Sequence, residues 1–200
     1  VMLDTRLHGR DKGFEYATDL PMRSQVFDVS NPERVRAVSD AQAMALPEAS
    51  QQRINIPFDM NSGGAKPILD YHTIKPLDAA SLPKGWRYLP DIQRFMDGPL
   101  KAEGRTLLGD DQEQWLQQTL RRGQARGSTW QIIGQQVLMG RLSIPALTDE
   151  ELQLERLPAA QAAQFKSMQL MGGKGVPFNL DAWDGYSACR ARVQKNLRRY

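Results

Sequence analysis

The sequence contains little cysteine and little histidine. Cys189 is its single cysteine, so an intramolecular disulfide framework is excluded. The two histidines, His8 and His72, lie far apart in the sequence, and a lone histidine does not make a metal site. The sequence therefore predicts neither a metal site nor a set of catalytic residues within these 200 residues.

Long hydrophobic runs are also missing. No apolar stretch approaches the roughly 20 residues that a membrane-spanning helix needs, and none resembles the hydrophobic region of a signal peptide. Hydrophobic residues make up 40% of the chain and charged residues 24%, which is ordinary for a globular domain. We expect no stable association with a membrane, and the composition indicates no particular oligomeric state.

The excess of positive charge is small. A net charge of +3 is too low to predict nucleic-acid binding unless the cations are clustered. A cluster does occur in the last segment, Trp183 to Tyr200, which is predicted to be helical. Its cations are not interleaved with stacking aromatics, so a solvated helix face is favoured over a nucleic-acid surface. The clustered cations are Arg190, Arg192, Lys195, Arg198 and Arg199.

The clearest secondary-structure signal lies between Leu107 and Arg141. A helix is predicted to begin with Asp110 or Asp111 as its N-cap and to end at Gly123, which suits a left-handed C-terminal residue. Its apolar stripe is expected to bury Trp115. The other members of the stripe are Leu116, Thr119 and Leu120.

A strand is predicted directly after this helix, from Thr129 to Met139. Apolar residues occur at both odd and even positions, which is typical of a strand covered on both faces, as in a parallel sheet. We expect Trp130 to be buried against the helix. Together with a strand at the N-terminus and several helices, this pattern indicates an α/β fold.

The remaining segments give weaker signals. A short helix is predicted from Pro32 to Ala45, whereas seven prolines interrupt residues 46–100 and predict an irregular excursion of short elements. Within it, Asp59 to Asp70 only superficially resembles a calcium loop, and Tyr71 to Ile74 favours a strand. Helical stretches are expected from Thr148 to Leu157 and from Pro158 to Leu170. The run Met171 to Gly175 is predicted to be a turn, because it lacks the spacing of a phosphate-binding loop.

Three segments carry a resemblance to a known family. They are the L-D-T-R run from Met2 to Arg6, the pair Leu108–Leu116 and Trp130–Met139, and the W-D-G-Y segment from Asn179 to Tyr186 with Arg190. In this order they resemble the PhoD-like alkaline phosphatase and phosphodiesterase family. The family's metal-binding motifs, G-D-x-x-Y, D-D-H-E and G-D-x-H, have no counterpart in the sequence.

The resemblance implies that residues 1–200 are the central part of a single phosphatase domain, with 46–100 as an irregular insertion. The implied architecture is a four-layer αββα sandwich of two mixed sheets covered by helices. The parent protein would hydrolyse phosphomonoesters and diesters with iron and calcium ions, while this fragment would bind no metal and be inactive alone. Family membership further implies twin-arginine export to the periplasm or outside, with a cytoplasmic location as the alternative.

The loop that follows Arg6 is the candidate substrate contact. Ligands of α/β proteins lie at the loops beyond the carboxyl ends of strands, so Arg6, His8 and Arg10 can face a phosphate there. A solvated turn is the alternative for this loop. For the whole chain, the alternative function is a non-catalytic binding or scaffolding domain with a basic C-terminal helix.

Overall fold

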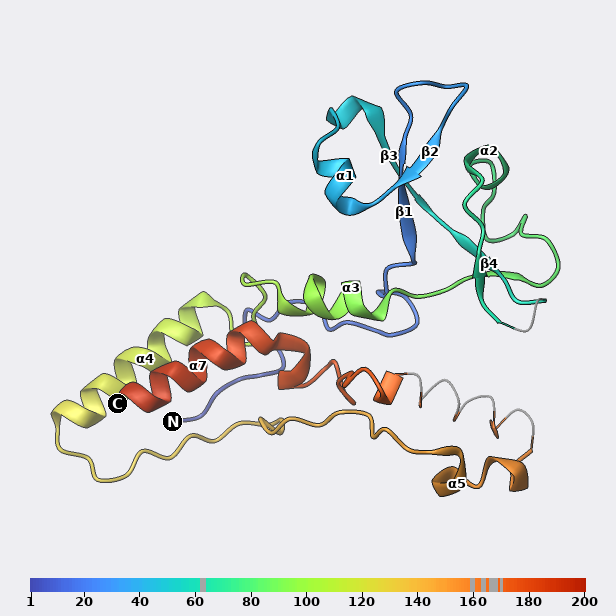
Figure 1. Ribbon diagram of the computed structural model, residues 1–200. Coiled ribbons are helices and arrows are strands. Elements are labelled where there is room, and N and C mark those ends of the chain that lie inside the picture. The colour runs from blue at the N-terminus through green and yellow to red at the C-terminus, as the bar shows by residue number, and fades with distance from the viewer. Residues whose placement is uncertain (62–63, 159–160, 163–164, 166–168, 170) are drawn as a thin grey trace. The chain divides into compact units, whose positions relative to one another are not determined.

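The computed structural model describes residues 1–61, 64–158, 161–162, 165, 169 and 171–200. The chain forms two compact units, drawn in Figure 1. The helical unit consists of Val1–Asp19 and Ile92–Tyr200, and the sheet unit consists of Leu20–Asp91. Each unit is described separately below.

The sheet unit contains two small antiparallel sheets, with strand orders β2-β1-β3 and β5-β4-β6. Phe27 and Phe58 contribute to its buried core, which also contains Ile56, Tyr71 and Ile74. The elements of this unit are β1 (Ser24–Asp28), β2 (Arg36–Val38), α1 (Asp40–Met44), η1 (Glu48–Ser50), β3 (Gln51–Asn55), β4 (Pro57–Asp59), β5 (Lys66–Pro67), α2 (Tyr71–Ile74) and β6 (Trp86–Tyr88).

Two predictions for this unit are wrong. The helix expected from Pro32 to Ala45 begins only at Asp40, because the preceding β2 pairs with β1 and Ser39 forms a capping box at the new start. The strand expected at Tyr71–Ile74 is the helix α2, because the Asp70 carboxylate accepts hydrogen bonds from the His72 and Thr73 amides. The first error comes from strand pairing and the second from a local cap.

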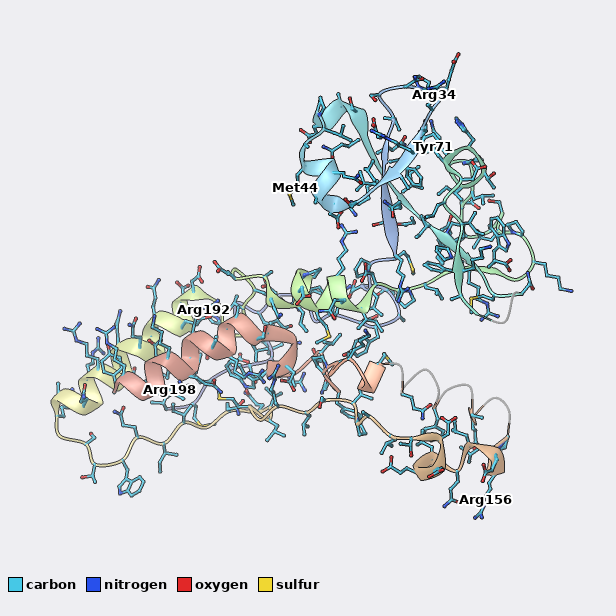
Figure 2. All side chains as sticks on the ribbon, in the orientation of Figure 1. Arg34, Met44, Tyr71, Arg156, Arg192 and Arg198 are labelled. Atoms are coloured by element: carbon cyan, nitrogen blue, oxygen red, sulfur yellow. The ribbon has the colours of Figure 1, made fainter. Side chains whose placement is uncertain are left out.

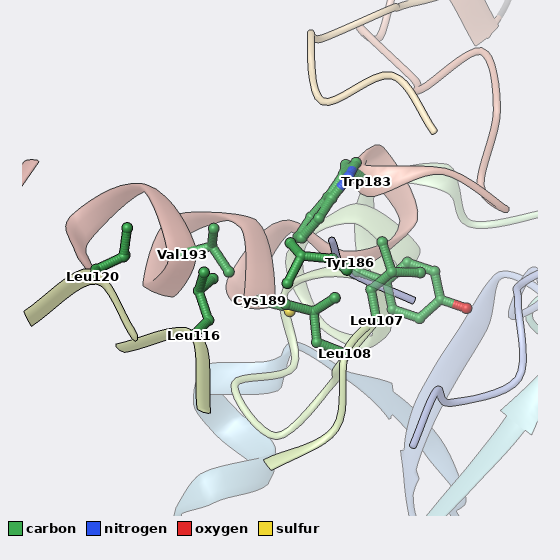
Figure 3. Packing of buried hydrophobic residues seen from close by; sticks show 9 residues of the cluster. Leu107, Leu108, Leu116, Leu120, Trp183, Tyr186, Cys189 and Val193 are labelled. Atoms are coloured by element: carbon green, nitrogen blue, oxygen red, sulfur yellow. The ribbon is translucent and has the colours of Figure 1, made fainter. Parts of the chain in front are cut away.

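The helical unit is organised around α4 and α7, which pack along each other (Figure 1). Their shared core is shown in Figure 3 and comprises Leu3, Leu107, Leu108, Leu116, Leu120, Trp183, Tyr186, Cys189 and Val193. The elements are α3 (Ile92–Asp97), the 3₁₀ helix η2 (Pro99–Lys101), α4 (Asp110–Ala125), α5 (Asp149–Leu152), the 3₁₀ helices η3 (Leu154–Arg156) and η4 (Trp183–Tyr186), and α7 (Ser187–Arg199).

The predicted central helix is confirmed as α4, but its N-cap was wrongly assigned. Gly109 is the N-cap and makes no side-chain capping bond, so Asp110 and Asp111 lie inside the first turn. The Thr106 hydroxyl accepts hydrogen bonds from the Leu108 and Gly109 amides instead. The helix also continues two residues beyond Gly123, to Ala125.

The buried face of α4 differs from the predicted stripe. Leu116 and Leu120 are buried as expected, whereas Trp115 is 45% exposed, so its predicted burial is wrong. Gln112 is buried in its place, accepting from the Asp4 amide at 2.6 Å and donating to the Asp4 carbonyl at 2.8 Å. Because an extended backbone segment lies against this face, a polar side chain satisfies its peptide groups there.

The prediction of a strand from Thr129 to Met139 is wrong, because the segment forms a single isolated bridge and bends at residues 136 and 137. Its one bridge in the described chain joins Gly134 to Met2 and is parallel, with Gly134 donating to the Val1 carbonyl at 2.7 Å. The direction of pairing was therefore predicted, but the burial was not. Trp130 is 84% exposed, because the even-numbered apolar side chains of this segment point away from the core of the unit.

The fold is mixed α/β, as predicted, with small sheets and separate helices. The C-terminal helix and the helical stretch that starts at Thr148 are confirmed, the latter by a capping box between Thr148 and Glu151. Residues 46–100 contain only short elements, as their prolines predicted. Much of the helix expected from Pro158 to Leu170 lies outside the described residues.

Candidate functional site

The candidate site lies in the helical unit, where the loop after the N-terminal segment meets the residues that precede α7. Arg6 Nη1 lies 2.6 Å from Asp181 Oδ2, and Arg10 Nη2 donates to Asp181 Oδ1. Arg10 Nε also donates to Tyr186 Oη at 3.1 Å. The structure thus brings Arg6 and Arg10 together on one carboxylate beside the W-D-G-Y segment.

Backbone geometry fixes the position of this loop. Gly9 and Gly109 both have positive φ angles, +64° and +73°, and a side chain at Gly9 would begin 2.8 Å from the Gly109 Cα atom. Two glycines therefore allow the loop to cross the start of α4 at close range. Before the crossing, Asp4 Oδ1 accepts from the Arg6 and Leu7 amides and turns the chain.

His8 is not part of the arginine cluster. Its side chain lines a separate, shallow cavity of about 400 Å³. The other residues of this cavity are Asp4, Asp111, Gln112 and Trp115. Of the three predicted substrate contacts, the structure therefore brings two together and places the third elsewhere on the same unit.

Asp181 sets the electrostatics of the cluster. Partial burial tends to raise the pKa of its carboxyl group, but hydrogen bonds from Arg10 and Arg6 outweigh burial and hold the pKa below its usual value. Asp181 is thus an anion that satisfies two guanidinium groups and remains half exposed. Because guanidinium forks bind phosphate as readily as carboxylate, an incoming phosphate can exchange with Asp181 for these donors.

Arg105 packs against the aromatic rings next to Arg10, and sequence reasoning missed it. The Arg105 guanidinium lies 3.6 Å from the centre of the Phe14 ring and 4.5 Å from that of the Tyr186 ring. Arg105 Nε donates to the Gly185 carbonyl at 2.8 Å. The W-D-G-Y resemblance covered both Asp181 and Tyr186 without assigning either a role, and no sequence signal identified Arg105.

The basic C-terminal helix presents fewer free cations than its sequence suggests. Arg192, which is labelled in Figure 2, binds Glu113 through both carboxylate oxygens. Its Nε lies 2.7 Å from Oε2 and its Nη2 lies 2.6 Å from Oε1. Arg190 is paired with Asp184 in the interior. Cys189 is buried and donates to Glu113, and burial raises the pKa of its thiol.

The described residues do not fit a metal centre of iron and calcium ions. Among them, no three histidine, cysteine, aspartate or glutamate side chains are close enough to hold an ion. The two histidines belong to different units. In the same part of the chain, no helix is long and apolar enough to cross a membrane.

Comparison with protein families gives one match. The PhoD-like phosphatase family matches residues 1–200, the whole chain. The chain belongs to the PhoD-like phosphatase family. No curated protein and no solved structure matches it. Membership accounts for the order of the L-D-T-R and W-D-G-Y segments, which the structure brings together in this PhoD-like chain through Arg6 and Asp181.

Proposed function

We propose that the chain is the central part of a phosphoester hydrolase that acts on phosphomonoesters and diesters. The observation that carries this proposal is the family match over all 200 residues. The convergence of Arg6 and Arg10 on Asp181 supports it, because two adjacent guanidinium groups are suited to phosphate. The reaction class is therefore hydrolysis of a phosphoester bond.

The chain's own residues bind and orient the phosphate in this proposal. Arg10 is the better positioned of the two arginines, because its guanidinium is already held by Tyr186 and lies 5.4 Å from the centre of that ring. Arg6 is more exposed and adds a second fork. His8 lies in a separate cavity of the same unit.

The metal ions of the family, iron and calcium, would supply the activated oxygen and neutralise the phosphoryl charge. In this proposal their ligands would come from the motifs that this sequence lacks, so the metal centre would lie on residues outside these 200. We also propose that the chain forms the middle of a four-layer αββα sandwich, with residues 46–100 as an insertion. We further propose export to the periplasm or the exterior, which is typical of the family.

The proposal is tested with the longer protein that contains this chain, assayed on chromogenic phosphomonoesters and diesters. Arg6→Ala should raise KM several-fold and change kcat little, because it removes a substrate contact and no reacting group. A matched control is Arg121→Ala, an exposed arginine on α4 outside the cluster. Absence of hydrolysis by the unmodified protein, with iron and calcium supplied, would refute the proposed function.

A further inference from the structure

A second cavity in the helical unit combines several cations with a single carboxylate. It has a volume of about 410 Å³ and shares no lining residue with the arginine cluster. Its charged lining residues are Lys101, Arg141, Lys174, Arg190 and Asp184. We propose that this cavity is a binding site for a phosphate-type oxyanion, distinct from the position at Arg6 and Arg10.

The carboxylate does not cancel the positive charge of the cavity. Asp184 is buried, with Oδ1 accepting from Arg190 Nη1 and Oδ2 accepting from the Leu142 amide at 2.8 Å. Both oxygens are therefore occupied, and one carboxylate faces four cationic side chains. Lys101 has an outside partner, Asp97, but this pair is exposed on both sides and costs little to separate.

Arg190 gives the site a buried donor. Its residue exposure is only 9%, yet Nη1 is its one guanidinium nitrogen that is bonded in the described chain. No fully buried side-chain nitrogen or oxygen among the described residues lacks a partner, so the other nitrogens of Arg190 reach solvent. Because Arg190 lines the cavity, these guanidinium nitrogens can donate to an acceptor that enters the cavity.

The rim of the cavity is built from two hydrogen-bonded segments. The Phe178 amide donates to the Leu142 carbonyl at 2.7 Å, and the Ile144 amide donates to the Val176 carbonyl at 2.9 Å. These bonds hold the chain beside Arg141 against the chain that follows Lys174. Both cations are exposed, and neither has a side-chain partner within the described residues.

The donors select the chemistry of the ligand. Guanidinium forks and ammonium groups together match a tetrahedral oxyanion of more than one charge, whereas a single carboxylate would leave most of the donors unused. Inorganic phosphate and the phosphate group of an ester share this chemistry. The turn from Met171 to Gly175 lacks the spacing of a phosphate-binding loop, but it places Lys174 at the rim of the cavity.

The test uses the 200-residue chain and needs no turnover. Inorganic phosphate is titrated at constant ionic strength, with sodium chloride as the balancing salt, and the Ser143 and Gly175 amides are followed by NMR. We expect saturable shifts of both amides. The double variant Arg141→Ala/Lys174→Ala should weaken the affinity about tenfold, because two charged donors are lost. The matched variant Arg121→Ala/Lys195→Ala makes the same change in net charge at exposed helical positions and should stay within about twofold.

The outcomes separate the alternatives. Absence of saturable shifts at Ser143 and Gly175 would overturn the proposal, as would equal weakening by the two double variants. A parallel titration with 4-nitrophenyl phosphate distinguishes free phosphate from the phosphate group of an ester. Shifts of the same two amides would assign the site to the phosphate of an ester. Absence of these shifts would assign it to free phosphate. The exposed positions of Arg141 and Lys174 leave the fold intact, which a thermal midpoint equal to that of the unmodified chain verifies.

Discussion

Truncation of Leu116 tests which face of α4 is buried. Leu116 is fully buried between α4 and α7, whereas its neighbour Trp115 is 45% exposed. Leu116→Ala removes about three carbons, worth roughly 0.8 kcal/mol each when transferred from water, so the transfer loss is about 2.4 kcal/mol. The cavity that remains adds to this loss, and we expect a total of about 3 to 4 kcal/mol.

Trp115→Ala is the matched comparison. A buried tryptophan would cost about 3 to 5 kcal/mol on truncation to alanine, as the sequence alone predicted for this residue. Because almost half of Trp115 faces solvent, we expect less than about 2 kcal/mol. Leu116→Ala should destabilise the protein more than Trp115→Ala, because the buried face of α4 contains Leu116 and not Trp115. This order does not depend on the absolute value of either free energy.

Urea unfolding followed by far-UV circular dichroism measures both variants, since this signal does not depend on the tryptophan that is removed. The free energy of unfolding is compared at equal slope, so that changes in the unfolded state are recognised. If Trp115→Ala were as costly as Leu116→Ala, the described face of α4 would be refuted.

Two further predictions concern the residues around the start of α4. Thr106→Ala should lower the free energy of unfolding by about 1 to 2 kcal/mol in urea, because its hydroxyl accepts from the Leu108 and Gly109 amides just before the helix. Asp110→Ala should cost at most about 0.5 kcal/mol through the helix dipole, and the opposite order would contradict this role of Thr106. Burial tends to raise the pKa of Glu113, but Arg192, Cys189 and Thr106 hold it below the ordinary 4.5. Its stabilising contribution is therefore complete above pH 4.5 and is lost as the pH falls through the folded-state pKa. Glu113→Gln should flatten this acid-side loss in urea midpoints measured from pH 6 to pH 3, and an unchanged slope would count against the pairing.

The elements that were predicted correctly have local causes. The capping box at Thr148 and the spacing of Tyr186, Arg190 and Val193 lie within single segments, so their sequences sufficed. The family resemblance also rested on short runs of residues. These features need no knowledge of what packs against them.

Apart from the helix α2, which a local cap at Asp70 decided, the errors arose where another segment decided the outcome. Gln112 is buried because the Asp4 backbone lies against it, and the two residues are 108 positions apart in the sequence. Trp130 is exposed because the outer face of its extended segment is not covered by described residues of the helical unit. In the sheet unit, β2 replaced the start of a helix because β1 was available for pairing.

The candidate site was only half predictable for the same reason. Arg6 and Arg10 could be selected from the loop in which they lie, but Asp181 is separated from them by most of the chain. Arg105 likewise reaches Tyr186 across a long separation in sequence. Convergence of this kind is a property of the folded unit and leaves no periodic pattern in the sequence.

In the proposed function, these residues bind the phosphate of a phosphoester, and the metal centre of the hydrolase lies on other residues. The most direct measurement compares the 200-residue chain with the longer protein that contains it, using a chromogenic phosphoester with iron and calcium supplied, and measures the metal bound by each. We predict chelator-sensitive turnover and bound metal for the longer protein, and neither for the chain alone. Chelator-sensitive turnover by the 200-residue chain would contradict the account.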